Sequence, residues 1–178
     1  MEEMLRENIA LLIRTPAVLD ALLRGLPGIW TRSNEGGTTW NVREIVGHMA
    51  HCEREDWIPR AKIILEHGEG EAFPPLNRLG HVEEIEGKTL DELLEEFAGL
   101  RGRSLKELEG LALDENELAK RGTHPAFGAV TLAQLLSTWA THDLTHLHQI
   151  SRVMAYQRHK AVGPWKAYLG VLKGVADS

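Results

Sequence analysis

Four stretches of the chain carry apolar residues at three- and four-residue spacing, and this helical periodicity limits the possible folds more than any other feature. The stretches cover residues 16–24, 42–67, 90–110 and 132–159. Two short loops and one long connection, residues 68–87, join them. Amphipathic helices joined in this way predict an all-α four-helix bundle with a long crossover between its second and third helices. A length of 178 residues fits one domain spanning residues 1–178.

Capping signals mark where these helices begin. A side-chain oxygen followed three residues later by Glu or Gln can close a capping box, and the chain offers three such pairs: Asn41 with Glu44, Thr89 with Glu92, and Thr131 with Gln134. Thr15 and Pro16 are typical of an N-cap and a first helical position. Pro59 is expected to kink the second long helix or to end a segment of it.

Smaller elements are expected between the long helices. We expect a short helix over Glu3–Ile13, a helical turn over Asp114–Ala119 and a terminal turn over Trp165–Leu172, after the break at Gly163-Pro164. Polar and glycine-containing stretches predict loops over Ser33–Thr39 and Arg121–Val130, and a long surface connection over Gly68–Gly87.

His142 and His146 are the strongest chemical signal in the sequence. They are four residues apart in the last long helix, so they lie on nearly the same face with Cβ atoms roughly 6 Å apart. Trp139, Ile150 and Val153 share that face, which predicts that both imidazoles point into the bundle. Inward imidazoles need partners, and two of them can converge on one divalent metal ion.

His48 is the favoured third ligand because it continues the apolar stripe of the second long helix. His51 is the second choice, and Cys52 or a carboxylate stays open. A free cysteine more often packs in the core as a small apolar residue, and this argues against Cys52 as a ligand. The other histidines are expected at the surface or as caps: His67, His81, His124, His148 and His159. Three imidazoles with open positions suit zinc, nickel, iron, cobalt or manganese, and the ligand type does not select among them.

Bulk composition argues against several classes of function. The net charge is −6 with no basic stripe, so no nucleic-acid partner is expected. The single cysteine permits no internal disulfide and fits a reducing compartment. Neither a signal peptide nor an apolar run long enough to cross a membrane is evident, so a cytoplasmic protein without a membrane partner is expected.

Two motifs resemble those of the DinB/YfiT-like superfamily. The segment Trp40–Glu53 resembles its second-helix motif, in which a tryptophan and a capping residue precede the first metal histidine, here His48. The segment His142–Ile150 resembles its later motif, two histidines four apart followed by Gln-Ile, here His142 and His146.

The resemblance implies an up-down-down-up four-helix bundle with a three-histidine metal site at one end of the core. It also implies a metal-dependent S-transferase that joins a low-molecular-weight thiol such as bacillithiol or mycothiol to an electrophile. Three histidine ligands with open coordination positions equally suit a metal-dependent hydrolase, in which the ion activates water. A small-molecule thiol or electrophile and a second copy of the chain are the partners that the resemblance implies. The competing hypothesis is a non-catalytic stress-response or binding protein with a structural or vestigial metal site. A haem or di-iron bundle is disfavoured because Glu-x-x-His motifs are missing.

Other polar and aromatic residues have two readings each. Asp143 reads as part of a solvated helix face, whereas Gln149 could orient an imidazole or be an amide satisfied by the backbone. Tryptophan more often packs in a core than lines a pocket, and the candidates are Trp40, Trp57 and Trp139. The acidic residues Glu53, Glu55 and Asp56 read as the wet side of their helix, although one could be a general base; Arg43 and Arg60 could hold an anionic substrate.

Overall fold

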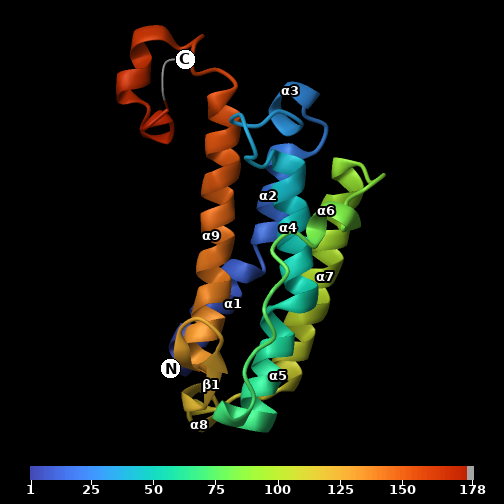
Figure 1. Ribbon diagram of the computed structural model, residues 1–178, viewed down its shortest axis with the longest axis vertical. Helices are drawn as coiled ribbons and strands as arrows, with labels where there is room; N and C mark the ends of the chain where they lie inside the picture. Colours follow the sequence, from blue (N-terminus) through green and yellow to red (C-terminus); the bar gives the residue numbers. More distant parts are fainter. Residues whose placement is uncertain (176–178) are drawn as a thin grey trace.

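The computed structural model describes residues 1–175, and its four long helical columns form a bundle (Figure 1). The first column joins α1 (Glu2–Leu12) to α2 (Thr15–Leu23), and the second joins α4 (Val42–Glu55) to α5 (Trp57–His67). The third and fourth columns are α7 (Leu90–Gly110) and α9 (Leu132–Tyr156). Followed along the chain in Figure 1, they run up, down, down and up. The predicted four-helix bundle and its topology are confirmed.

Short elements connect the columns. α3 (Gly28–Thr31) follows α2, η1 (Gly68–Gly70) ends the second column, α6 (His81–Glu84) lies within the crossover, and α8 (Glu115–Ala119) follows α7. After α9, η2 (Gly163–Tyr168) and η3 (Gly170–Leu172) form the predicted terminal turns, which project beyond the bundle in Figure 1. Within residues 1–175, no helix is both long enough and apolar enough to cross a membrane.

The three predicted capping boxes are all present, at the starts of α4, α7 and α9. In the first, the side chain of Asn41 accepts from the backbone N–H of Glu44 at 3.0 Å, and the Glu44 carboxylate accepts from the Asn41 N–H at 2.8 Å. Thr15 is not the N-cap that the sequence suggested. It lies inside the first turn of α2, which Arg14 caps without a side-chain bond.

The second column breaks at Asp56 rather than at Pro59. Asp56 has φ −109° and ψ −72°, which departs from helical geometry and separates α4 from α5, although its N–H still donates to the Cys52 carbonyl at 3.0 Å. A proline clashes with the carbonyl four residues earlier, here that of Glu55, where α4 ends. Pro59 then occupies the first turn of α5, where no intrahelical donor is required. The break therefore precedes the proline that causes it.

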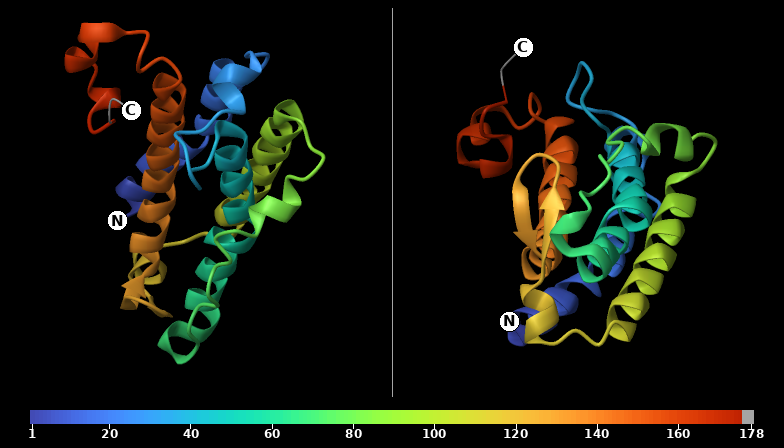
Figure 2. Two further views of the ribbon diagram at one scale, coloured as in Figure 1. Left: turned by 45° about the horizontal axis from the view of Figure 1, so that its top comes forward. Right: turned by 60° about the horizontal axis from the view of Figure 1, so that its bottom comes forward.

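The predicted loop over Arg121–Val130 is instead a β-hairpin. β1 (Arg121–His124) pairs antiparallel with β2 (Gly128–Thr131). The hairpin packs closely on α5, because a Cβ added to Gly122 would lie 2.7 Å from Cγ1 of Ile64. The N–H of Phe73 in the crossover donates to the Thr123 carbonyl at 2.9 Å. Figure 2 shows the hairpin beside the lower end of α9.

The crossover is not only the surface connection that the sequence suggested. Phe73, His81 and Ile85 are all buried, so the segment is pinned at three points along the second column. At Gly47 of α4 the approach is so close that an added Cβ would lie 2.3 Å from Cγ2 of Ile85. This packing fixes the crossover against the face of α4 that carries His48.

The apolar core has two parts. One, around Trp57, Trp139 and Leu118, fills the lower half of the bundle. The other, around Val46, Phe97 and Ile150, fills the upper half. On α9, His142 and His146 lie between Ala140 of the lower cluster and Ile150 of the upper one. On α4, His48 lies one turn before Cys52 of the lower cluster, and helix packing brings the three histidines together at the seam between the two columns.

Candidate metal centre

Three imidazoles meet at that seam. Each of His48, His142 and His146 offers one ring nitrogen, and the three atoms all lie within 4.8 Å of one another. His48 and His146 are buried, whereas His142 is partly buried. His48 comes from α4 and the other two from successive turns of α9, so helix packing alone gathers them.

The spacing of the rings suits a single metal ion. The Nε2 atoms of His142 and His146 lie 3.0 Å apart. Nitrogen ligands at 2.0–2.1 Å on one tetrahedral ion would be separated by about 3.3 Å. The ring centroid of His48 lies 4.9 Å from that of His146 and 5.5 Å from that of His142. An ion could therefore bind all three rings with only small side-chain adjustments, and the donor set fits a divalent transition metal.

All three rings are held neutral. Burial, and then the neighbouring imidazoles, lower the pKa of His48 to about 3 and that of His142 to about 3. Burial also lowers the pKa of His146. At pH 7 the rings therefore present lone pairs rather than positive charges, which is the form that binds metals.

Gln149 sets the tautomer of His146. The ring Nδ1 of His146 lies 2.8 Å from Oε1 of Gln149, an oxygen that can only accept. Nδ1 therefore carries the proton and donates it, which leaves the Nε2 lone pair facing His142. Of the two readings of Gln149, this contact favours the one in which it orients an imidazole.

Cys52 lies against the site without completing it. Its Sγ is 3.5 Å from Nε2 of His48 and 4.0 Å from Nε2 of His142. The side chain is buried, and burial together with the neighbouring carboxylates of Asp56 and Glu53 raises the pKa of the thiol. Cys52 is accordingly a protonated, small apolar residue beside the three rings, as the commoner reading of the sequence had it.

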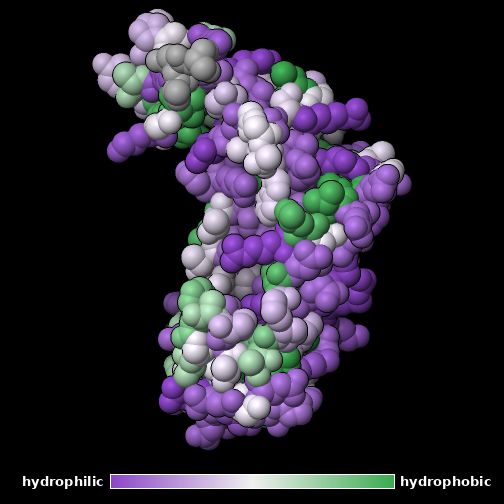
Figure 3. Space-filling view, viewed as in Figure 1, coloured by the Kyte–Doolittle hydropathy of each residue, from purple (hydrophilic) through white to green (hydrophobic). Residues whose placement is uncertain are grey.

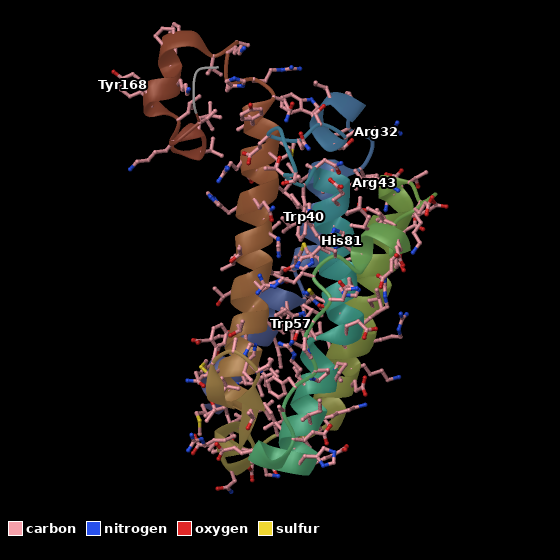
Figure 4. The ribbon with its side chains drawn as sticks, viewed as in Figure 1. Arg32, Trp40, Arg43, Trp57, His81 and Tyr168 are labelled. Carbon is pink, nitrogen blue, oxygen red and sulfur yellow. The ribbon has the colours of Figure 1, made fainter. Side chains whose placement is uncertain are left out.

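His51, the second-choice ligand, faces another way. Its Nδ1 lies 2.8 Å from Oε1 of Glu84 on α6, and Gly80 gives it room, since a Cβ there would lie 2.5 Å from its ring. His51 thus holds the crossover to α4. His81, expected at the surface, is fully buried, with its ring 4.6 Å from Trp40 and 5.5 Å from His48. Figure 4 shows Trp40 and His81 close together at the seam.

A cavity of about 430 Å³ opens onto the three imidazoles. Trp57, labelled in Figure 4, lines it. Its ring lies 5.0 Å from that of His142 and is stacked 6.0 Å from that of Trp139. Trp40 and Trp57 line the cavity, whereas Trp139 is wholly in the core, so the core reading of tryptophan holds fully only for Trp139. The cavity walls come from α4, α5, the crossover, the hairpin and α9.

A buried ionic cluster supports the histidine face of α9. Asp143 accepts from both terminal nitrogens of Arg101 at 2.7 and 2.9 Å, and Arg101 also donates to Glu53 at 2.8 Å. The same Glu53 oxygen accepts from the indole N–H of Trp139 at 2.8 Å. Asp143 and Glu53 were expected on a solvated helix face, but both are buried. Arg101 gives each of them a partner, and the sequence did not indicate that this arginine lies in the core. Glu55 is exposed as expected.

Comparison with known proteins identifies the family. The family model of the DinB superfamily matches residues 11–150, most of the chain.

The chain belongs to the DinB superfamily.

A solved structure shares the fold of this DinB protein. YfiT from Bacillus subtilis, described as a probable metal-dependent hydrolase with an unusual four-helix bundle topology, matches with a TM-score of 0.71 at 22% identity, over 90% of each chain. No protein of curated function matches the sequence.

Of the remaining histidines and arginines considered in the sequence of this DinB protein, some line the cavity and others lie away from it. His67 and His148 are exposed as expected, and His159 bonds the Tyr156 carbonyl near the end of α9. His124 instead lines the cavity. Arg43 donates to the carbonyls of Lys88 and Ile85, away from the cavity, whereas Arg60 lines it. The sequence could have signalled His124, because β-branched residues flank a Pro-Ala-Phe-Gly turn typical of a hairpin.

The three imidazoles lie where the two apolar clusters come together. Cys52 of the lower cluster follows His48 by one turn, and Met49 of the upper cluster follows it directly. The cavity therefore reaches the centre from the side, through the seam.

Proposed function

We propose that His48, His142 and His146 bind one divalent metal ion and that the chain uses it to catalyse attack on a small electrophile, by hydrolysis or by transfer to a thiol. The observation that carries the proposal is that all three imidazoles line one cavity, so open coordination positions would face a space of about 430 Å³. A bound divalent ion would supply Lewis acidity and lower the pKa of a coordinated water or thiol. Its identity, among zinc, nickel, iron, cobalt and manganese, is left to elemental analysis.

The protein's own groups then position and deprotonate the nucleophile. Asp56 is the proton acceptor in this proposal, and among the described residues lining the cavity it is the one carboxylate. Burial raises the pKa of Asp56, and the charges of Arg60 and His51 oppose part of this rise. The raised pKa makes the carboxylate a stronger base than an exposed aspartate. Trp57 and Phe73 supply apolar walls that exclude bulk water.

The test is a metal-dependence assay. Purified protein would be supplied with each candidate metal and assayed for hydrolysis of activated esters and for conjugation of low-molecular-weight thiols to electrophiles. Turnover is expected with at least one metal, to be lost in His48→Ala and His142→Ala, and to persist in the exposed control His148→Ala. Turnover no greater than that of His48→Ala, across all thiols, esters and metals, would exclude the proposal.

A structural metal site is the second candidate, and the closeness of Cys52 favours it. With Sγ 3.5 Å from Nε2 of His48, a small rotation could supply a fourth ligand, and structural zinc sites are usually closed by four protein ligands. Cys52→Ala separates the two. Loss of metal affinity and of chelator-sensitive stability, without any turnover in the parent protein, would favour the structural site. Retained metal and turnover would favour the open one.

The proposal extends to the setting of the protein. A thiol or electrophile of low molecular weight is the partner, with no nucleic-acid or membrane partner, in a cytoplasmic homodimer. The net charge of −6 supports the absence of a nucleic-acid partner. Trp165 and Tyr168, which are 70% and 88% exposed on the projecting terminal turns, support a contact with a second copy. Light scattering of the purified protein tests the dimer.

A further inference from the structure

The cavity beside the three imidazoles carries more positive than negative charge. Among the described residues that line it, Arg60 and Arg78 are opposed by one carboxylate, that of Asp56. A positively charged cavity stands out in a chain whose net charge is −6. Such a cavity concentrates anions, since low-dielectric walls focus the field of the charges that line it.

Arg60 and Asp56 form one fixed pair in the cavity wall. Nη1 of Arg60 lies 2.8 Å from Oδ1 of Asp56, and both side chains are about nine-tenths buried. The Arg60 guanidinium also lies over the ring of Phe73, 5.3 Å from its centroid, and its Nε has no acceptor in the described structure. The two charges offset each other, so this pair does not account for the positive balance.

Arg78 supplies the uncompensated charge. It lies in the crossover between the buried Phe73 and His81 and is exposed at the cavity. Within residues 1–175 its guanidinium makes no ion pair or hydrogen bond. Because the crossover is pinned on both sides, Arg78 remains at this position without a protein anion.

The rest of the cavity is largely apolar. Trp57, Phe73 and Leu76 line it, and Phe127 at the tip of the hairpin is 78% exposed beside it. Phe127 stacks on His124 with ring centroids 4.4 Å apart. Figure 3 shows pale green and white residues over the hairpin on this face, next to strongly hydrophilic ones. A complementary ligand has an apolar body and one anionic group.

We propose that the cavity takes small compounds that combine an apolar body with a carboxylate or phosphate group, and that Arg78 holds that group. Only the statement that such a compound is the substrate rests on the proposed function. Its recognition by Arg78 requires no metal. Arg78 is then a specificity-determining residue that selects anionic electrophiles and keeps their other end toward the three imidazoles.

The test is a binding comparison with matched probes. 4-Phenylbutyrate, its neutral analogue 4-phenylbutanamide and phenyl phosphate would be titrated into the full chain, as purified and after dialysis against a chelator. Calorimetry or tryptophan fluorescence would report binding, since Trp40 and Trp57 line the cavity. The chelated sample isolates the contribution of arginine, because no ion is there to bind the anion directly.

Arg78→Gln is the informative variant and Arg103→Gln its control, because Arg103 is another exposed arginine and lies outside the cavity on α7. In the chelated parent protein, at least one anionic probe should bind about tenfold more tightly than the amide, since a charge-assisted bond at a partly exposed site contributes on that order. Arg78→Gln should remove most of this preference and leave the amide unchanged, and added salt should reduce it.

Equal affinity for the anionic and neutral probes in the parent protein would overturn the inference. So would a preference that survives Arg78→Gln, or one that Arg103→Gln removes equally. These results are independent of turnover, so a protein that selects anions but has no activity would retain this inference and lose the proposed function. Metal-dependent turnover without a preference for the anionic probes would support the proposed function and exclude this inference.

Discussion

Arg101 on α7 and Asp143 on α9 form a doubly hydrogen-bonded ion pair inside the bundle, with N–O distances of 2.7 and 2.9 Å. Each residue is 1% exposed. Asp143 directly follows His142, so the pair fixes the rotation of α9 at the turn that supplies two of the three imidazoles. The position of the candidate metal centre thus depends on a contact made away from it.

Removal of Arg101 should be strongly destabilising. Arg101→Met leaves Asp143 and Glu53 buried without their cation, and loss of one partner in a buried ion network costs about 3–5 kcal/mol. The exposed Arg24, which pairs with Asp20, offers the control: Arg24→Met should have little effect on stability, because water and salt screen an exposed ion pair. Urea unfolding measures both, and equal losses would contradict a structural role for the buried cluster.

Two glycines in helices should respond oppositely to alanine. At Gly47 the added Cβ would lie 2.3 Å from Ile85, so Gly47→Ala should destabilise the protein by about 1–3 kcal/mol through overpacking. At Gly102 nothing lies within 4 Å, so Gly102→Ala should stabilise it by about 0.5–1 kcal/mol through helix propensity. Thermal unfolding of both variants tests how tightly the crossover packs on α4, and a stabilising Gly47→Ala would refute that packing.

Gln149 should act on the metal through His146. Gln149→Met removes the acceptor that keeps the proton on Nδ1, and loss of such a contact typically lowers metal affinity about 10- to 100-fold. His148→Ala, at the exposed neighbouring position, should leave affinity unchanged. Competition titration with a chromophoric chelator measures both. If the two variants matched the parent, Gln149 would have no orienting role.

Acid should destabilise the metal-free protein. His48 and His142 have pKa values lowered to about 3 from an ordinary 6.5, so between these values the unfolded chain binds protons that the folded chain does not. Their contribution to stability is complete above pH 6.5 and is lost progressively as the pH falls toward 3.

The midpoint of thermal unfolding, measured in chelator from pH 7 to pH 4.5, should therefore fall, and His48→Gln should flatten its pH dependence. His67→Gln, at an exposed position, serves as the control. A His48→Gln curve parallel to that of the parent would show that the burial of this imidazole does not govern the acid response.

The sequence predicts the features of this fold that local contacts decide. The capping box of Asn41 and Glu44 and the spacing of His142 and His146 lie within one or two helical turns, so their geometry follows from helix parameters alone. The bundle follows from the same periodicity. These features place two of the three imidazoles before any tertiary contact is known.

Features that depend on distant residues could not be predicted in this way. Asp143 and Glu53 are buried only because Arg101, 42 and 48 residues away, reaches them. His81 is buried only because the crossover packs against α4. A polar residue looks solvated in the sequence until its partner is known, as Asp143 and Glu53 did, although the imidazoles beside them were predicted to point inward.

An anomalous-difference map from crystals of the full chain grown with cobalt would show directly whether the three imidazoles share one ion. One strong peak is expected about 2.0–2.2 Å from a ring nitrogen of each of His48, His142 and His146, with at least one coordination position facing the cavity. A map without a peak at saturating cobalt, or with its peak on other side chains, would contradict the three-histidine metal centre.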